Sequence, residues 1–212
     1  ELWKKTGRWS DEAVDSWFKT KLKNDTELGL GFSHEEPLVN ILSNFVSSYK
    51  DLPIAIYQFQ TKFRNELRAK SGILRGREFL MKDMYSFHAT KEDFDSFYEK
   101  MKEVYKKIFS RVGIGHLTYM TFASGGVFSK YSHEFQTLTS AGEDTIYLDE
   151  GNGIAVNKEV LDGEVLINLG LKKEKLIEHK AIEVGNIFEL KTRFSEPLNL
   201  FFNDEKGKKH NV

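Results

Sequence analysis

The fold is decided by two neighbouring segments, Phe63-Arg64-Asn65-Glu66 and Arg75-Gly76-Arg77-Glu78-Phe79-Leu80-Met81-Lys82-Asp83-Met84-Tyr85. They are expected to end one strand, over residues 54–66, and to begin a second, over residues 77–88, with a polar loop between them. Because side chains alternate between the faces of a strand, Arg64 and Glu66 should point the same way. One face of the second strand would carry Arg77, Phe79, Met81, Asp83 and Tyr85. Such a mixture of cation, carboxylate and ring suits a nucleoside triphosphate bound beside a small zwitterion.

The composition is that of an ordinary folded domain. The chain has 212 residues, 40% hydrophobic and 30% charged, which is enough for one large domain. It contains no cysteine, which excludes disulfides and thiolate metal centres and fits a cytoplasmic location. No apolar run approaches the ~20 residues of a membrane span, so no membrane association is expected, and no signal peptide is visible. The net charge of −1 gives no overall nucleic-acid signature.

Apolar periodicity predicts helices over residues 34–50 and 91–112. Ser33 and Glu36 stand at the spacing of a capping box at the start of the first helix. Further strands are expected near residues 116–122, 132–139, 145–149, 181–190 and 198–203. Strands beside helices in this order predict an α+β fold, in which an antiparallel sheet is flanked by helices.

The segments around Arg64 and Phe79 resemble motif 2 of the class II aminoacyl-tRNA synthetases. The continuation from Phe79 to His88 is similar to that of the prolyl-tRNA synthetases of the bacterial type. Four other blocks resemble the same family in the same order: residues 1–9 just after motif 1, the recognition loop Ser33-His34-Glu35-Glu36, residues 132–136 and residues 183–188. Ordered blocks over nearly the whole chain are far more specific than a single motif.

The resemblance implies a class II catalytic-domain fold and a proline–tRNA ligase activity. Such an enzyme joins proline to ATP, with Mg²⁺ as the usual helper, and passes the prolyl group to tRNA(Pro). Activation brings two anions together, so fixed cations are needed around the α-phosphate. The full-length protein is expected to be a homodimer in the cytoplasm.

By this resemblance the ATP-binding residues are Arg64, Glu66, Arg75 and Phe79. Arg64 would contact the α-phosphate and the substrate carboxylate, because a guanidinium matches both groups with two parallel hydrogen bonds. Glu66 would accept from the adenine amino group, Phe79 would stack on the base, and Arg75 would reach the triphosphate tail. The alternatives from the residues alone are a surface ion pair for Arg64 and a core position for Phe79.

The residues expected around proline are Ser33, Glu35, Arg64 and His133 by the resemblance, together with Met81, Asp83 and Tyr85, which share the site face of the second strand. Glu35 is the expected partner of the amine, since the capping box would occupy Glu36. His133 is either a pocket residue or a core histidine with satisfied hydrogen bonds. Its neighbour Glu134 is a possible Mg²⁺ ligand together with ATP.

The matching blocks run from the end of motif 1 through motif 2 and stop before motif 3. Residues 1–212 are therefore expected to be part of a catalytic domain, and the isolated piece should bind ATP weakly and activate proline negligibly. Residues 150–180 take the place of the large editing insertion of many bacterial prolyl enzymes.

Other members of the class fit less well. The threonyl enzymes hold a zinc ion through a cysteine, and this chain has none. The seryl and glycyl enzymes lack the block from Met81 to Tyr85. A free-standing editing domain should lack motif 2. A non-catalytic relative that binds tRNA or a partner protein remains the alternative from another functional class.

Overall fold

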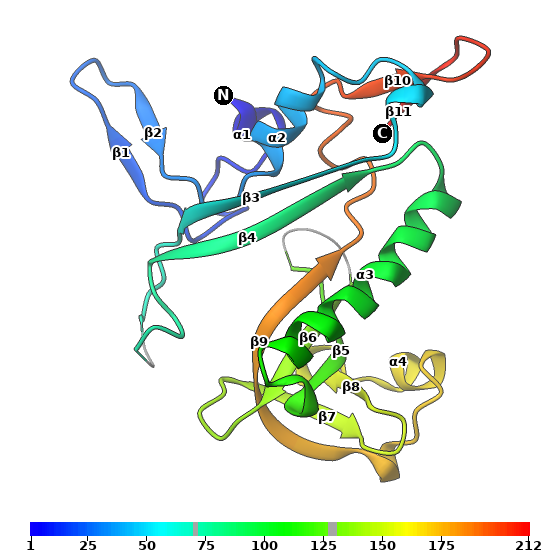
Figure 1. Cartoon of the computed structure of the whole chain (residues 1–212). Coiled ribbons are helices and arrows are strands. Elements are labelled where there is room, and N and C mark those ends of the chain that lie inside the picture. Colours follow the sequence, from blue (N-terminus) through cyan, green and yellow to red (C-terminus); the bar gives the residue numbers. More distant parts are fainter. Residues whose placement is uncertain (70–71, 127–130) are drawn as a thin grey trace. The chain divides into compact units, whose positions relative to one another are not determined.

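The computed structural model describes residues 1–69, 72–126 and 131–212 (Figure 1). These residues divide into two compact units. The first unit comprises residues 1–95 and 191–212, and the second comprises residues 96–190. The chain therefore leaves the first unit once and returns to it near residue 191.

The first unit is built on a long antiparallel pair of strands, β3 (Ile54–Phe63) and β4 (Glu78–Phe87). In their register Gln58 lies opposite Asp83 and Lys62 opposite Phe79, so the even residues of β3 share a face with the odd residues of β4. The pair confirms the two predicted strands, but β3 is shorter than expected. Arg64 and Glu66 lie beyond its end, where the Arg64 amide still donates to the Arg77 carbonyl at 2.9 Å.

The helix α2 (Glu35–Leu42) is shorter than the predicted helix over residues 34–50. It ends where the side chains of Ser43 and Asn44 donate to the Asn40 carbonyl at 2.8 and 3.1 Å and so satisfy its last turn. The predicted capping box at Ser33 is also wrong, because the N-cap residue is His34 and no side chain caps this end.

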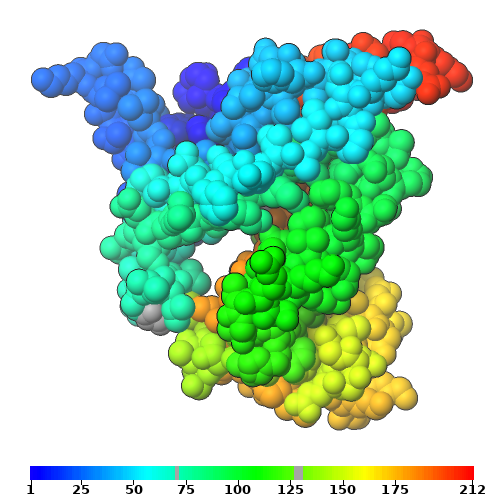
Figure 2. Space-filling model, in the orientation of Figure 1, coloured from blue at the N-terminus to red at the C-terminus, as the bar shows by residue number. Residues whose placement is uncertain are grey.

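The remaining elements of the first unit surround an aromatic core. They are α1 (Leu2–Lys5), β1 (Lys19–Lys21), β2 (Glu27–Gly29), the 3-10 helix η1 (Tyr49–Asp51), β10 (Phe201–Asn203) and β11 (Lys209–Asn211). The β1–β2 hairpin, in blue, stands out from this unit (Figure 2). The ring of buried Trp17 has its centroid 5.4 Å from Trp3, 5.1 Å from Trp9 and 4.6 Å from Phe32. The three tryptophans of the chain thus all lie in the first unit.

The second unit contains a closed barrel with the strand order β5-β6-β9-β7-β8. Its strands are β5 (Thr118–Ser124), β6 (Tyr131–Leu138), β7 (Asp144–Asp149), β8 (Ile154–Asn157) and β9 (Ile177–Phe188). The other pairs are antiparallel, but β5 and β8 pair in parallel and close the barrel. The prediction of a purely antiparallel sheet is therefore wrong at this contact.

Residues 150–180 contribute to the barrel core. They include β8, the 3-10 helices η3 (Lys158–Val160) and η4 (Lys173–Lys175), the helix α4 (Gly163–Asn168) and the start of β9. Val156 from β8 packs with Val165, Leu166 and Leu171 in one buried cluster. This weakly patterned segment therefore supplies structure that the barrel needs.

The helix α3 (Lys91–Arg111) confirms the prediction for residues 91–112. Within the second unit its Tyr105 and Phe109 rings lie 4.9 and 5.4 Å from the buried Phe135 ring of β6. A Cβ atom at Gly185 would lie 3.2 Å from both α3 rings, so the glycine permits this close packing. Within residues 1–69, 72–126 and 131–212, no helix has the length and apolar character needed to cross a membrane.

Candidate functional site

Asp83 is the centre of a hydrogen-bonded network on the β3–β4 sheet. It accepts from Lys62 Nζ at 2.8 Å, from Gln58 Nε2 at 2.8 Å and from the Tyr85 hydroxyl at 2.6 Å. Lys62 is only 1% exposed, so this is a buried ion pair. Burial opposes ionisation of Asp83, but the hydrogen bonds outweigh it and lower its pKa.

Glu35, the first residue of α2, joins this network through Tyr85. Its Oε2 atom accepts from Arg8 Nη1 at 3.0 Å and from the Ser33 hydroxyl, whereas its Oε1 atom lies 3.3 Å from the Tyr85 hydroxyl. Burial, followed by the charges of Glu35 and Asp83, raises the pKa of Tyr85, so the hydroxyl keeps its one hydrogen. The shorter contact gives that hydrogen to Asp83. Glu35 Oε1 can thus accept a further hydrogen bond, because the Arg8 and Ser33 donors are both on Oε2.

Arg8 anchors the loop that contains Glu35. It is 2% exposed and donates to Glu35 Oε2 at 3.0 Å, to both Glu36 oxygens at 3.1 Å and to the Ser33 hydroxyl at 3.3 Å. The Thr6 hydroxyl donates to Glu36 at 2.7 Å. Burial raises the pKa of Glu36, although Arg8 and Thr6 counter this. Glu36 is structural, as expected, but it is held by Arg8 and Thr6.

Aromatic groups fix the Arg8 guanidinium in its plane. Its central carbon lies 4.7 Å from the Phe32 ring centroid and 5.1 Å from that of Phe194. The Arg8 carbonyl accepts from Trp17 Nε1 at 2.8 Å, which ties its backbone to the aromatic core. The position of this cation is thus determined by packing as well as by charge.

The residues of motif 2 that were expected to bind ATP lie at the end of the same strand pair. The Arg64 guanidinium lies over the Phe79 ring, 5.4 Å from its centroid, and Arg64 Nε donates to the Phe32 carbonyl at 3.4 Å. Glu66 is 3.4 Å from Arg75 Nη1 in a partly exposed ion pair. Such partly exposed pairs contribute little to stability. Met81 is half-buried in β4.

His133 and Glu134 lie in the second unit, on β6, and not in the unit that carries Arg64 and Glu35. His133 Nδ1 is hydrogen-bonded to the Tyr98 hydroxyl at 2.9 Å. Burial and the charge of Lys102 lower the pKa of His133 to about 4, so the imidazole is neutral at pH 7. These contacts favour a packed barrel histidine over a pocket residue.

Glu134 does not fit the role of a magnesium ligand in this arrangement. Burial and the charge of Glu183 raise its pKa to about 7. Its oxygens accept from Gln136 at 2.9 Å, from Asn157 at 3.3 Å and from Asn186 at 3.4 Å. Amide donors therefore occupy the positions that a cation would need. Among the described residues there is no group of three or more His, Cys, Asp or Glu side chains placed to hold a metal ion.

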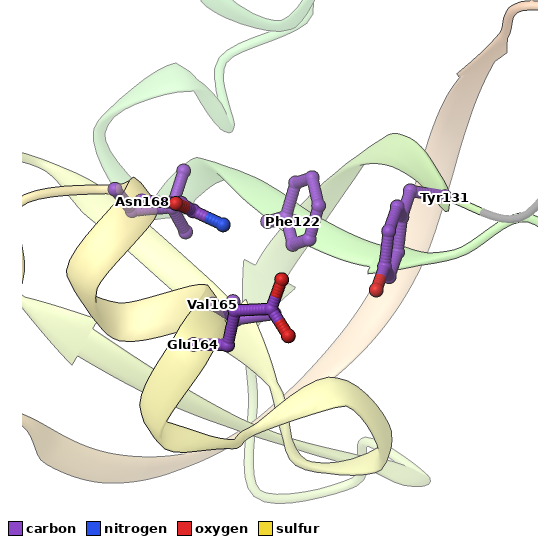
Figure 3. A pocket seen from close by; sticks show the side chains of 6 residues that line it. Phe122, Tyr131, Glu164, Val165 and Asn168 are labelled. Carbon is purple, nitrogen blue, oxygen red and sulfur yellow. The ribbon is translucent and has the colours of Figure 1, made fainter.

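The second unit also contains a small pocket of about 140 Å³, which is lined by Phe122, Tyr131, Glu164, Val165, Asn168 and Leu169 (Figure 3). Its walls come from β5, β6 and α4, and its rings of Phe122 and Tyr131 lie 4.9 Å apart. The residues that resemble motif 2 and the recognition loop are not part of its lining.

Comparison with known proteins identifies the family of the chain. A family model described as the tRNA synthetase class II core domain (G, H, P, S and T) matches residues 18–212. The chain belongs to the class II tRNA synthetase core-domain family. It is 40% identical over 194 residues to a proline–tRNA ligase of Bacillus cytotoxicus, covering 89% of this chain and 34% of that protein. It is 37% identical over 226 aligned positions to a proline–tRNA ligase of Sulfurimonas denitrificans, covering 98% of this chain and 51% of that protein.

Two solved structures show the same class II synthetase fold at low sequence identity. The prolyl-tRNA synthetase of Giardia lamblia in complex with prolyl-adenylate has a TM-score of 0.70 and 18% identity, over 95% of this chain and 34% of that one. The enzyme of Cryptosporidium parvum with L-proline and AMP has a TM-score of 0.64 and 16% identity, over 94% and 34%. The chain thus spans only part of the length of its relatives: 34% of the Bacillus cytotoxicus ligase and 51% of the Sulfurimonas denitrificans ligase.

Sequence reasoning missed Arg8 and Lys62. The signal in the sequence for Lys62 was its position two residues before Arg64. Strand alternation then places Lys62 on the same face of the β3–β4 pair as Asp83. Arg8 lies in a segment without periodic spacing of apolar residues. Its role depends on contacts with Ser33, Glu35 and Glu36, which are 25 to 28 positions away in the sequence. No local pattern reports a contact of that kind.

Proposed function

We propose that this chain is the proline-activating part of a proline–tRNA ligase. The observation that carries the proposal is the partly buried network of Glu35, Tyr85 and Asp83, in the same unit as Arg64 and Phe79. It combines an acceptor for an amine with a cation for a carboxylate and a ring for a base. The names of the relatives support the same substrate.

In the proposed complex Glu35 Oε1 accepts an N–H from the secondary ammonium of proline. Arg8 and Ser33 fix the Glu35 carboxylate, Asp83 holds the Tyr85 hydroxyl, and Met81 forms part of the apolar wall. Arg64 binds the proline carboxylate and the α-phosphate of ATP, because its planar fork matches both anions. Phe79 stacks on adenine, Glu66 accepts from its amino group and Arg75 binds the triphosphate tail.

Activation is then an in-line displacement at phosphorus. One oxygen of the proline carboxylate forms a bond to the α-phosphorus, the bond to the bridging oxygen breaks, and pyrophosphate leaves with that electron pair. Arg64 stabilises the negative charge that spreads over the α-phosphate oxygens. The adenylate later passes its prolyl group to a terminal ribose hydroxyl of tRNA(Pro), and AMP leaves.

Mg²⁺ would reach the site with ATP, bound by the phosphate oxygens, and would neutralise part of their charge. Glu134 is not given a part in this, because its oxygens accept amide hydrogens. The family resemblance alone supports His133 as a proline-pocket residue of the complete protein.

The proposal extends to the protein as a whole. In it, β3 and β4 belong to an antiparallel catalytic sheet, residues 1–212 span the end of motif 1 through motif 2, and residues 150–180 replace the editing insertion. The protein acts as a homodimer in the cytoplasm. These features are supported by the family resemblance, whose blocks follow one another in the family's order along this chain.

Amino-acid-dependent exchange of pyrophosphate into ATP tests the proposal. The full-length protein that carries this chain should catalyse exchange with proline and with none of the other amino acids at a comparable rate, alanine being the best of the rest. Exchange that depends on a different amino acid would contradict the assignment of proline. The absence of exchange with all twenty amino acids would indicate a non-catalytic relative.

A further inference from the structure

The network around Glu35 contains more carboxylates than cations. Glu35, Glu36 and Asp83 are joined by hydrogen bonds to two buried cations, Arg8 and Lys62. Each of the five side chains is buried or nearly so, with side-chain exposures of 9%, 0%, 13%, 2% and 1%, respectively. Burial lowers the pKa of the adjacent His34, so this residue does not supply the missing positive charge. A buried carboxylate whose negative charge is not matched by a neighbouring positive charge favours binding of a cationic group.

We propose that Arg8 is a positioning residue for recognition of the substrate amine. The inference rests on the proposed function and assigns a role to a residue that does not touch the substrate. Arg8 and Ser33 occupy Glu35 Oε2, and this leaves Oε1 directed to the side of Tyr85 and the sheet. The carboxylate thus presents one defined oxygen to an incoming ammonium group.

The geometry of Arg8 explains why an arginine is needed there. One nitrogen, Nη1, bridges Glu35 and Glu36, while the other, Nη2, reaches the Ser33 hydroxyl. The rings of Phe32 and Phe194 hold the guanidinium plane. A lysine at this position keeps the charge but loses the planar fork and its packing on the two rings, so it holds Glu35, Glu36 and Ser33 in a less defined geometry.

The charge of Arg8 is shared between two carboxylates, and this sharing matters for the ligand. If Arg8 were balanced by Glu35 alone, Glu35 would attract an ammonium group less strongly. Glu36 takes part of that charge through its 3.1 Å contact with Arg8 and so keeps it from Glu35. Neutralising Glu36 should therefore weaken amine recognition although Glu36 has no contact with the ligand in this proposal.

The test uses two ligands that differ only in the amine. Tetrahydrofuran-2-carboxylate has the ring and carboxylate of proline, but an ether oxygen replaces the ammonium group and cannot donate a hydrogen bond. Calorimetric titration of the full-length protein without ATP gives the ratio of the two dissociation constants, which is the amine preference. The wild-type protein should prefer proline at least a hundredfold.

Two variants and one control decide the outcome. Arg8→Lys should reduce the amine preference at least tenfold, and Glu36→Gln at least threefold, while ATP affinity changes less than twofold in each. Thr6→Val is the matched control: it removes the 2.7 Å hydrogen bond to Glu36 but no contact of Glu35 or Arg8, and it should keep the preference within twofold. If Arg8→Lys does not fold, Glu36→Gln with Arg8 intact still gives the measurement.

The possible results separate this inference from the function on which it rests. A wild-type protein without amine preference overturns the proposed function. A wild-type preference that persists in Arg8→Lys, or in Glu36→Gln where Arg8→Lys is unfolded, overturns the positioning role alone. Equal weakening of both ligands by the variants has the same meaning, because it shows damage to the pocket in general.

Discussion

Replacing Lys62 by methionine tests the buried ion pair that holds Asp83 in the candidate site. Lys62→Met keeps the length and most of the volume of the side chain but removes its charge. The Lys62 and Asp83 side chains are 1% and 13% exposed and are joined at 2.8 Å. The variant therefore leaves a carboxylate in a nearly dry environment without its cation.

The expected loss of stability follows from these contacts. Removal of one partner from a buried ion pair destabilises a protein by about 3–5 kcal/mol. Asp83 keeps its hydrogen bonds from Gln58 and Tyr85, at 2.8 and 2.6 Å, which places the loss at the lower end, about 3 kcal/mol. Lys62→Met together with Asp83→Asn should lose less than the sum of the single variants by about 1–2 kcal/mol, because both remove the same interaction.

Urea unfolding followed by tryptophan fluorescence is a suitable assay. Trp3, Trp9 and Trp17 all lie in the first unit, so the signal reports on the unit that contains the pair. Lys82→Met is a matched control, since Lys82 is exposed and belongs to the opposite face of β4. The control should change the free energy of unfolding by less than about 0.5 kcal/mol.

The pH dependence of the same experiment has a defined sign. The folded-state pKa of Asp83 is lowered from 3.8, so ionised Asp83 stabilises the fold above pH 3.8 and this stabilisation is lost as the pH falls through the lower folded value. The difference between wild type and Lys62→Met should therefore be largest near pH 7 and shrink below pH 4. A loss under about 1 kcal/mol at pH 7, or additive single variants, would refute the reasoning.

Other expected outcomes concern the chemistry and the second unit. Arg64→Ala should slow proline-dependent pyrophosphate exchange at least a hundredfold, about 3 kcal/mol, whereas near-normal exchange would make Arg64 a surface residue. On the proposal that residues 150–180 take the place of the editing insertion, the full-length protein should charge some alanine onto tRNA(Pro) without hydrolysing it; rapid deacylation of alanyl-tRNA would contradict this. Glu134 has a folded-state pKa raised from 4.5 to about 7, so barrel stability should fall by about 3 kcal/mol between pH 4.5 and 7 and then level off. Hydrogen exchange of β6 amides should show this fall in wild type and its loss in Glu134→Gln; an equal fall in both would exclude Glu134 as the cause.

The strands β3 and β4 were predictable because they are long and carry alternating side chains. The end of α2 was not, because the Ser43 and Asn44 side chains bond back to helix carbonyls and stop a pattern that continues in the sequence. The parallel contact of β5 with β8 was not predictable either. It joins Thr121 to Ala155 through barrel closure, and nothing local in either segment specifies that pairing.

The candidate site was predictable where its residues lie in one motif. Arg64 and Phe79 stand close together, and Asp83 and Tyr85 share a face, as strand alternation requires. The contact between Tyr85 and Glu35 spans fifty residues and was not predicted, although both residues were expected at the proline pocket. Arg8 and Lys62, the cations that pair with these carboxylates, were missed, since a buried charge has no periodic signature in the sequence.

The most direct measurement of the central claim is a crystal structure of the full-length protein with a non-hydrolysable prolyl-adenylate analogue. The account predicts that the ring nitrogen lies within hydrogen-bond distance of Glu35 Oε1 and that Arg64 contacts the phosphate mimic, with adenine on Phe79. An analogue bound elsewhere, for example at the pocket lined by Phe122 and Tyr131, would contradict it. So would an analogue whose ring nitrogen is held by another carboxylate.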